Sequence, residues 1–141
     1  MFSEEVVTVV APASTLASAP GPVALRDLQE TTQLVLTDRS SLTSGADYGV
    51  QGRNIWRLAD LGAKHALLRV GLGWGHMPRW LVEQDLVTGR LTRIELESPS
   101  AGLMPFQVVY PTDRVPGAAG RWLLERCRPA SGFFVTKSFE A

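Results

Sequence analysis

The chain has 141 residues, a length typical of one globular domain. Apolar residues make up 45% and charged residues 20%, which is close to the average composition of globular proteins. Lys and Arg together number 14 and Asp and Glu together number 14, so the formal net charge is zero. This balance excludes the strong basic surplus with which many proteins grip a nucleic-acid backbone.

The sequence also indicates in which cellular compartment the protein resides. The single cysteine, Cys127, rules out a disulfide within the chain and favours a reducing environment. No apolar run approaches the roughly 20 residues that a membrane-spanning helix needs. Glu4 and Glu5 stand where a signal peptide would carry Lys or Arg. We therefore expect a cytoplasmic protein that has no contact with a membrane.

The first 60 residues predict short strands separated by loops. The β-branched run Val6–Val10 is typical of a buried strand. The following stretch, 11–22, is rich in Ala, Ser and Pro and predicts a loop. Next we expect a short helix, a second strand, a polar loop and a third strand, at 25–30, 33–37, 38–52 and 54–59.

A helix is predicted over 61–70. Asp60 is placed to cap its first turn, and Gly71 stands where the helix would end. The apolar positions that recur at helical spacing are Ala63, Ala66, Leu67 and Val70. Residues 72–77 then fit a short strand or a turn.

Pro78 is well placed to begin the next helix, which Gly89 would end. Trp80, Leu81 and Leu86 are expected to point inward from it. The remaining elements are two strands and a last helix, at 91–96, 106–110 and from 116 onward. Because strands and helices alternate, the fold class is α/β with a mixed or largely parallel sheet.

Gly71, Gly73 and Gly75 form a G-x-G-x-G pattern. The pattern differs from the dinucleotide-binding fingerprint, which follows a strand and has a later third glycine. One interpretation is that the glycines let the backbone turn sharply between packed elements. The other is that they let a ligand reach the backbone. The two interpretations are compatible.

No pattern of catalytic or metal-ligating residues emerges. His65 and His76 are eleven positions apart, and neither a cysteine nor a second histidine stands at a spacing suited to zinc. A nucleophile elbow of the form G-x-S-x-G is missing, and Cys127 is expected on the inward face of the last helix. We therefore expect no enzyme, no cofactor and no metal.

The polar segment that follows the second predicted strand is the first candidate for a binding site. Ligands of open α/β sheets lie beyond the carboxyl ends of strands, and hydroxyl and backbone N–H groups there can hold an anion. Thr37, Ser40 and Ser41 lie in this segment. The alternative is an ordinary polar turn. His76, beside Trp74, is a further candidate for a ligand contact.

A longer pattern resembles the effector-binding domain of LysR-type transcriptional regulators. It runs from Trp56 to Leu68, continues through Gly71-Leu72-Gly73-Trp74-Gly75-His76-Met77-Pro78, and ends in Asp85-Leu86-Val87-Thr88-Gly89-Arg90-Leu91. The family shows a helix, a glycine-rich stretch ending in Leu-Pro or Met-Pro, a helix, and Gly-x-Leu before a strand. Leu25-Arg26-Asp27-Leu28 fits the family's preceding helix.

The resemblance implies a periplasmic-binding-protein-like fold of type II, with an effector cleft between two α/β subdomains. Residues 1–129 would supply most of subdomain two and the C-terminal part of subdomain one, and 130–141 would be a tail. The effector, a small molecule such as an organic anion, would contact Thr37, Ser40 and Ser41 on one side and Trp74 and His76 on the other.

The same resemblance implies partners. DNA would be bound only through a winged helix-turn-helix domain, which has no counterpart in this chain. The strand at 106–110 would lack neighbours, and its unpaired backbone groups would invite association with another copy. A homo-oligomer is therefore expected. The alternative to an effector-binding role is a ligand-free module for dimerisation or interaction, derived from the same domain.

Overall fold

The structure is a computed structural model, and it describes residues 2–37, 49–98, 101–106 and 114–126. The chain divides into two compact units, one formed by 5–102 and the other by 1–4 together with 103–141. Most of the described elements belong to the first of these units. Within the described residues, no helix is both long enough and apolar enough to cross a membrane.

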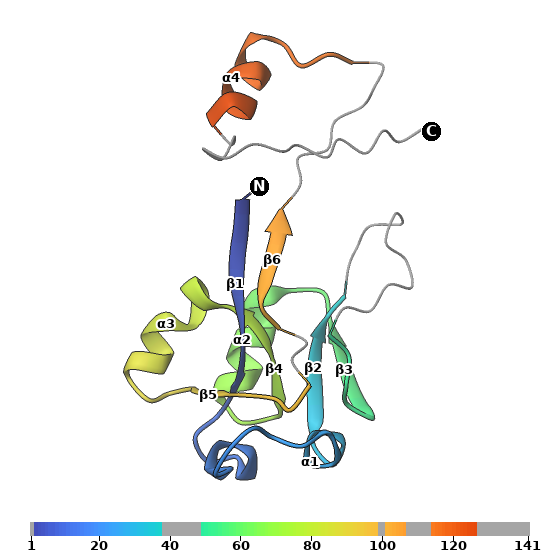
Figure 1. Ribbon diagram of the computed structural model, residues 1–141, viewed down its shortest axis with the longest axis vertical. Helices are drawn as coiled ribbons and strands as arrows, with labels where there is room; N and C mark the ends of the chain where they lie inside the picture. Colours follow the sequence, from blue (N-terminus) through green and yellow to red (C-terminus); the bar gives the residue numbers. More distant parts are fainter. Residues whose placement is uncertain (1, 38–48, 99–100, 107–113, 127–141) are drawn as a thin grey trace. The chain divides into compact units, whose positions relative to one another are not determined.

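The order of the elements agrees closely with the order expected from the sequence (Figure 1). The strands are β1 (Phe2–Val10), β2 (Thr32–Leu36), β3 (Asn54–Leu58), β4 (Trp74–Pro78), β5 (Thr92–Ile94) and β6 (Leu103–Phe106). The helices are the 3-10 helix η1 (Thr15–Ser18), α1 (Leu25–Gln29), α2 (Leu61–Arg69), α3 (Arg79–Val87) and α4 (Ala118–Arg126). The predicted strand at 106–110 overlaps β6 only at Phe106, because 107–113 lie outside the described residues.

The sheet is mixed, as expected for this α/β chain. Its strands follow the order β3-β2-β4-β1-β5, and β6 also pairs with β1. β2 is parallel to β3 and β4, whereas β1 is antiparallel to β4 and β5. The carboxyl ends of β2, β3 and β4 therefore point to the same edge of the sheet, where ligands of such folds bind.

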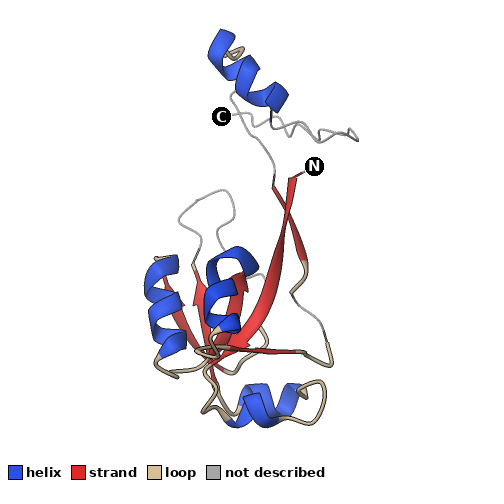
Figure 2. Cartoon of the chain, turned by 90° about the vertical axis from the view of Figure 1, so that its left-hand side faces the viewer, coloured by secondary structure: helices blue, strands red, loops and turns tan. Residues whose placement is uncertain are grey.

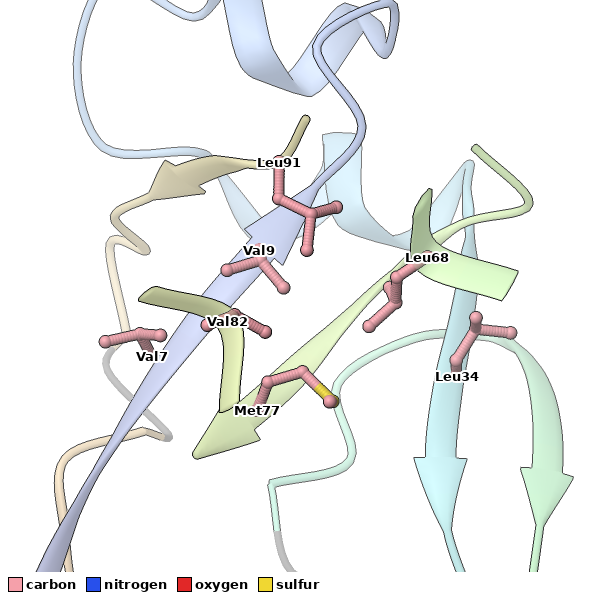
Figure 3. Close-up of a cluster of buried hydrophobic side chains, with 7 residues drawn as sticks. All are labelled: Val7, Val9, Leu34, Leu68, Met77, Val82 and Leu91. Carbon is pink, nitrogen blue, oxygen red and sulfur yellow. The ribbon is translucent and has the colours of Figure 1, made fainter. Parts of the chain in front are cut away.

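α2 and α3 cover one face of the sheet (Figure 2). Alternate residues of each strand point to this face, so Val7 and Val9 of β1 meet Leu34 of β2 and Met77 of β4 (Figure 3). The buried members of this cluster are Val7, Val9, Leu34, Leu68, Met77, Val82 and Leu91. Burying each such side chain contributes about 1.5–3 kcal/mol.

η1 and α1 pack against the opposite face. Leu16 and Leu28, from these two helices, contact Trp74 of β4 in a second cluster of buried side chains. The other members are Val10, Val23, Ile94 and Leu96. Trp74 has no exposed surface, and its indole N–H donates to the carbonyl oxygen of Leu28 at 3.3 Å.

The G-x-G-x-G glycines let β4 and β2 lie close together. Gly71, with φ of +82°, ends α2 in the left-handed conformation that favours glycine. A Cβ on Gly73 would lie 2.2 Å from the carbonyl oxygen of Thr32, and a Cβ on Gly75 would lie 2.8 Å from that of Leu34. Gly71 thus makes the sharp turn that the sequence predicted, whereas Gly73 and Gly75 permit a close approach of strands that it did not predict.

The inward faces of two helices differ from those expected. Trp80 is 62% exposed, although it was expected to point inward, and Val70, one of the apolar positions that recur at helical spacing, is 72% exposed. Lys64 of α2 and Asp85 of α3 are buried instead. Lys64 donates to the carbonyl oxygen of His76 and Asp85 is hydrogen-bonded to His65, which offsets the cost of removing both from water.

We predict that Gly73→Ala destabilises the fold by at least about 2 kcal/mol, because the new methyl group must push the backbone of β2 away from β4. Urea unfolding of the two proteins measures the change. Gly21→Ala is the matched control, since a Cβ there meets nothing within 4 Å. Equal losses of stability in both variants would contradict the close approach of the strands.

Candidate functional site

The residues proposed from the sequence occupy different environments. Thr37 follows β2 directly, is exposed, and donates its backbone N–H to the carbonyl oxygen of Leu58 at 2.7 Å. His76 is partly buried on β4, whereas Trp74 lies in the core and offers no surface to a ligand. Ser40 and Ser41 lie outside the described residues.

Gln33 of β2 holds residues 49–52, the segment that precedes β3. Its side chain is 1% exposed and uses both ends of its amide. The oxygen Oε1 accepts the backbone N–H groups of Gln51 at 2.9 Å and Gly52 at 2.7 Å, and Nε2 donates to the carbonyl oxygen of Gly49 at 2.7 Å. Residues 49–52 are therefore held against the sheet at a fixed position.

His76 contacts the same carbonyl oxygen from the neighbouring strand. Its Nε2 lies 3.1 Å from the oxygen of Gly49, and its Nδ1 lies 2.9 Å from the hydroxyl oxygen of Thr8. Because a carbonyl can only accept, Nε2 carries the proton in this arrangement, and Nδ1 accepts the hydroxyl proton of Thr8. The ring thus satisfies both neighbours as a neutral imidazole.

Burial reinforces this neutral state. It lowers the pKa of His76 from 6.5 to about 4, and the positive charge of Lys64 lowers it further, while the hydrogen bond to Gly49 acts in the opposite direction. The imidazole is therefore uncharged at neutral pH. It can hydrogen-bond polar groups, but it does not supply a positive charge.

Lys64 reaches the other side of the same strand. Its side chain is 4% exposed, and Nζ donates to the carbonyl oxygen of His76 at 2.7 Å. The stem of Lys64 passes over Gly75, where a Cβ would lie 3.1 Å from Cε. Burial lowers the pKa of Lys64 from 10.5 to about 8. The ammonium group thus remains mostly protonated near pH 7, close to the carboxyl half of β4.

Gln51 contributes a buried acceptor. Its Nε2 donates to the carbonyl oxygen of Ser98 at 2.8 Å, whereas its Oε1 is buried and has no hydrogen-bond donor within the part of the chain that the structure describes. Buried acceptors of this kind are rare, because leaving one unpaired costs about 1–3 kcal/mol. This oxygen is suited to a donor supplied by water or by a ligand.

The sequence carried a signal for one of the missed residues. Leu61, Lys64 and Leu68 recur at helical spacing on α2, so Lys64 lies on the same face as two leucines. Gln33, at the start of a Leu-Val-Leu run, carried no such signal. Its role depends on 49–52, which lie far from it in the sequence.

The chemistry of this cluster is that of hydrogen-bonded recognition. Histidine, lysine, glutamine and threonine side chains lie along β2, β4 and the neighbouring strand β1. No group of three or more His, Cys, Asp or Glu residues that could hold a metal ion occurs within the described ranges. The side chains of Gln33 and His76 are hydrogen-bonded to other groups of the protein, and Gln51 Oε1 is an acceptor that a polar ligand could use.

The family model of the LysR substrate-binding domain matches residues 1–132. The chain therefore belongs to the LysR substrate-binding domain family, and its fold is the periplasmic-binding-protein-like fold of type II. None of the curated proteins matches the sequence.

Solved structures of the same family share this fold. The effector-binding domain of QuiR in complex with shikimate is 19% identical, with a TM-score of 0.57, and the match covers 87% of this chain and 59% of that one. The regulatory domain of NMB2055 (MetR), a LysR family regulator from N. meningitidis, is 17% identical with a TM-score of 0.53, and the match covers 73% of this chain and 52% of that one. The regulatory domain of AphB in Vibrio vulnificus is 19% identical with a TM-score of 0.50, and the match covers 73% of this chain and 55% of that one. The chain thus spans between half and two thirds of each of these structures.

We predict that His76 makes stability fall with acid. Its folded pKa of about 4 lies below the ordinary value of 6.5, so between these pH values the unfolded chain binds a proton that the folded chain does not. Stability is therefore lost as pH falls from 6.5 to 4, by up to about 3 kcal/mol. His76→Gln should lack this pH-dependent loss of stability, because glutamine does not bind a proton in this range. Urea unfolding of both proteins between pH 4 and pH 6.5 measures the difference.

Nuclear magnetic resonance of the His76 ring provides an independent check. The ring resonances should stay those of the Nε2–H tautomer down to about pH 5 and change only below it. A titration centred near 6.5 would contradict the buried, neutral state.

Proposed function

We propose that this chain is the effector-binding part of a LysR-type transcriptional regulator, and that a small polar organic acid binds at the carboxyl ends of β2 and β4. The observation that carries the proposal is the convergence of Gln33 and His76 on the carbonyl oxygen of Gly49. It fixes 49–52, where the chain returns from the polar segment that begins at Thr37. Ligands of α/β folds of this kind bind beyond the carboxyl ends of the strands.

Three features support an anionic, hydroxyl-bearing ligand. Thr37 is exposed directly after β2 and offers a hydroxyl group, and in this proposal Ser40 and Ser41, which lie outside the described residues, supply two more. Lys64 places a positive charge behind β4, and no carboxylate pairs with it in the described part of the chain. Gln51 Oε1 has no donor among the described residues, and a ligand hydroxyl would supply one. The effector-binding domain of QuiR is described in complex with shikimate, a hydroxylated carboxylate.

In this proposal, His76 contacts the effector by its ring or holds the segment that does. Trp74, which the sequence suggested as a direct contact, supports the site from the core through its packing against Leu28. A ligand that favours one arrangement of two subdomains would shift a regulator between two states, because it can act only through its difference in affinity for them.

A screen of small organic acids tests the proposal. An acid that binds the folded chain raises its melting temperature, and calorimetry then gives the affinity. Thr37→Val and Ser40→Ala should each weaken binding by about three- to tenfold, the value of one hydrogen bond. Ser18→Ala, at the exposed end of η1, is the matched control and should bind normally.

Two results would count against the proposal. If an acid binds but both variants keep the affinity of the unchanged chain, the ligand binds elsewhere. If no hydroxylated or simple carboxylic acid stabilises the chain, the role in effector binding is wrong and an interaction role remains.

A ligand-free module for association is the second candidate function. It is favoured by α4, whose side chains Trp122 and Leu123 are 58% and 57% exposed, and by Val115 just before it. Within the described residues, α4 has no buried side chain. Apolar side chains gathered on one short helix are typical of a surface that packs against another chain.

We predict that, if α4 serves this role, the chain forms a dimer at protein concentrations on the order of 1–100 µM. Replacing Trp122 and Leu123 together by Gln should shift it toward monomer, and sedimentation equilibrium measures the change. Trp80→Gln on α3 is the control, since Trp80 is as exposed as Trp122 but lies on another helix. A monomer throughout this range would exclude the association role.

A further inference from the structure

Asp85 of α3 joins three parts of the chain through one buried carboxylate. Its side chain is 5% exposed, and His65 of α2 contacts Oδ2 through Nε2. Arg69, at the end of α2, and Arg90, after α3, approach Oδ1 through their Nε atoms at 3.5 and 3.0 Å. The backbone carbonyl of Asp85 also accepts the N–H groups of Arg90 and Leu91.

This arrangement leaves the outer ends of two guanidinium groups available. Arg69 and Arg90 use their Nε atoms toward Asp85, and Arg90 Nε also donates to the hydroxyl of Thr88. No hydrogen bond from their Nη atoms joins them to any residue in the described ranges. Their side chains are 41% and 50% exposed, and the two positive charges face a single carboxylate. A net positive charge therefore remains at this place.

A surface pocket of about 520 Å³ lies beside these two arginines. Its other lining residues are small or apolar, namely Ala11, Pro12, Ala13, Ala66, Val70 and Gly71. The volume falls within the range of small-molecule sites. Gly71 ends α2 just before β4 begins, so the pocket lies at the amino end of β4, away from the strand ends that bear Thr37.

We propose that this pocket is a second binding site, for a small carboxylate with a short aliphatic body. The planar fork of a guanidinium group matches the two oxygens of a carboxylate, and the aliphatic body would rest on the alanine and valine side chains. Asp85, which His65 also contacts, pairs with both arginines, and this pairing reduces the entropy lost on binding. The site goes beyond the proposed effector site and does not depend on it.

The carboxyl end of α2 limits the affinity of the pocket for a carboxylate. The last carbonyl groups of the helix carry a partial negative charge, which disfavours a nearby anion and favours the cation of Arg69. The carboxylate must therefore contact the guanidinium groups rather than the helix end. A dissociation constant on the order of a millimolar is expected for a ligand of four carbon atoms.

The test uses the 141-residue chain and sodium butyrate, with butyramide as an uncharged molecule of the same shape. Nuclear magnetic resonance follows the Nε–H signals of the arginines during each titration. Butyrate should shift the signals of Arg69 and Arg90 in a saturable way, and butyramide should not. Equal shifts with both molecules would overturn the proposal, because the charge would then be irrelevant.

Variants locate the site. Arg69→Gln and Arg90→Gln should each weaken butyrate binding by about tenfold, the effect of losing one charge-assisted hydrogen bond. In each variant Asp85 keeps His65 and one arginine, so the fold is retained. Arg26→Gln is the matched control, because Arg26 is an exposed arginine that pairs with Asp27 outside the pocket.

Ala66→Leu tests the contribution of the pocket independently of the charges of the two arginines. The larger side chain fills the cavity and keeps both arginines and a strong helix former on α2. Butyrate binding should be lost in this variant, and binding that persists would overturn the proposal. Thr37→Val should leave butyrate binding unchanged, so a failure of this site and a failure of the proposed effector site can be distinguished.

Discussion

The close contact between β2 and β4 is the constraint on which the binding edge of the sheet depends. Without side chains at Gly73 and Gly75, the backbone of β4 lies against the carbonyl groups of Thr32 and Leu34. The same absence makes room for Lys64 to cross β4 from α2 and reach the carbonyl oxygen of His76. A buried lysine is costly unless it is hydrogen-bonded, so the motif that lets the strands approach also permits this charge to lie behind them.

The polar contacts on the opposite face depend on that strand position. Trp74 of β4 pairs with Gln33 of β2, and the two strands are parallel. His76, two residues after Trp74 and on the same face of β4, therefore lies near the end of β2. Gln33 and His76 then reach the carbonyl oxygen of Gly49 together, although they come from different strands. Gly49, with φ of +68°, adopts a conformation that other residues rarely take. The returning segment is thus fixed by backbone geometry as well as by hydrogen bonds.

The order and class of the elements could be predicted from the sequence because they depend on local signals. Asp60 caps α2 by accepting the N–H of Ala63 at 2.6 Å, and Gly71 ends the helix in the left-handed conformation, both as expected. The inward faces were harder to predict, because a charged residue, Lys64, takes an inward position on α2 between two leucines at helical spacing. The contacts of Gln33 could not be predicted, since they join residues that are 16 to 19 positions apart across a loop.

The two edges of the sheet are held by different kinds of interaction, and this difference suits them to different ligands. In the carboxyl half of β4, a neutral imidazole binds a backbone carbonyl that the amide of Gln33 also holds, and the positive charge lies behind the strand. At its amino end, Asp85 gathers His65, Arg69 and Arg90 at one carboxylate, and the guanidinium groups face outward. Neutral hydrogen-bonding groups discriminate among ligands by the position of each donor and acceptor. Outward guanidinium groups instead select for negative charge, so the first edge is suited to recognising one molecule and the second to recognising a class of anions.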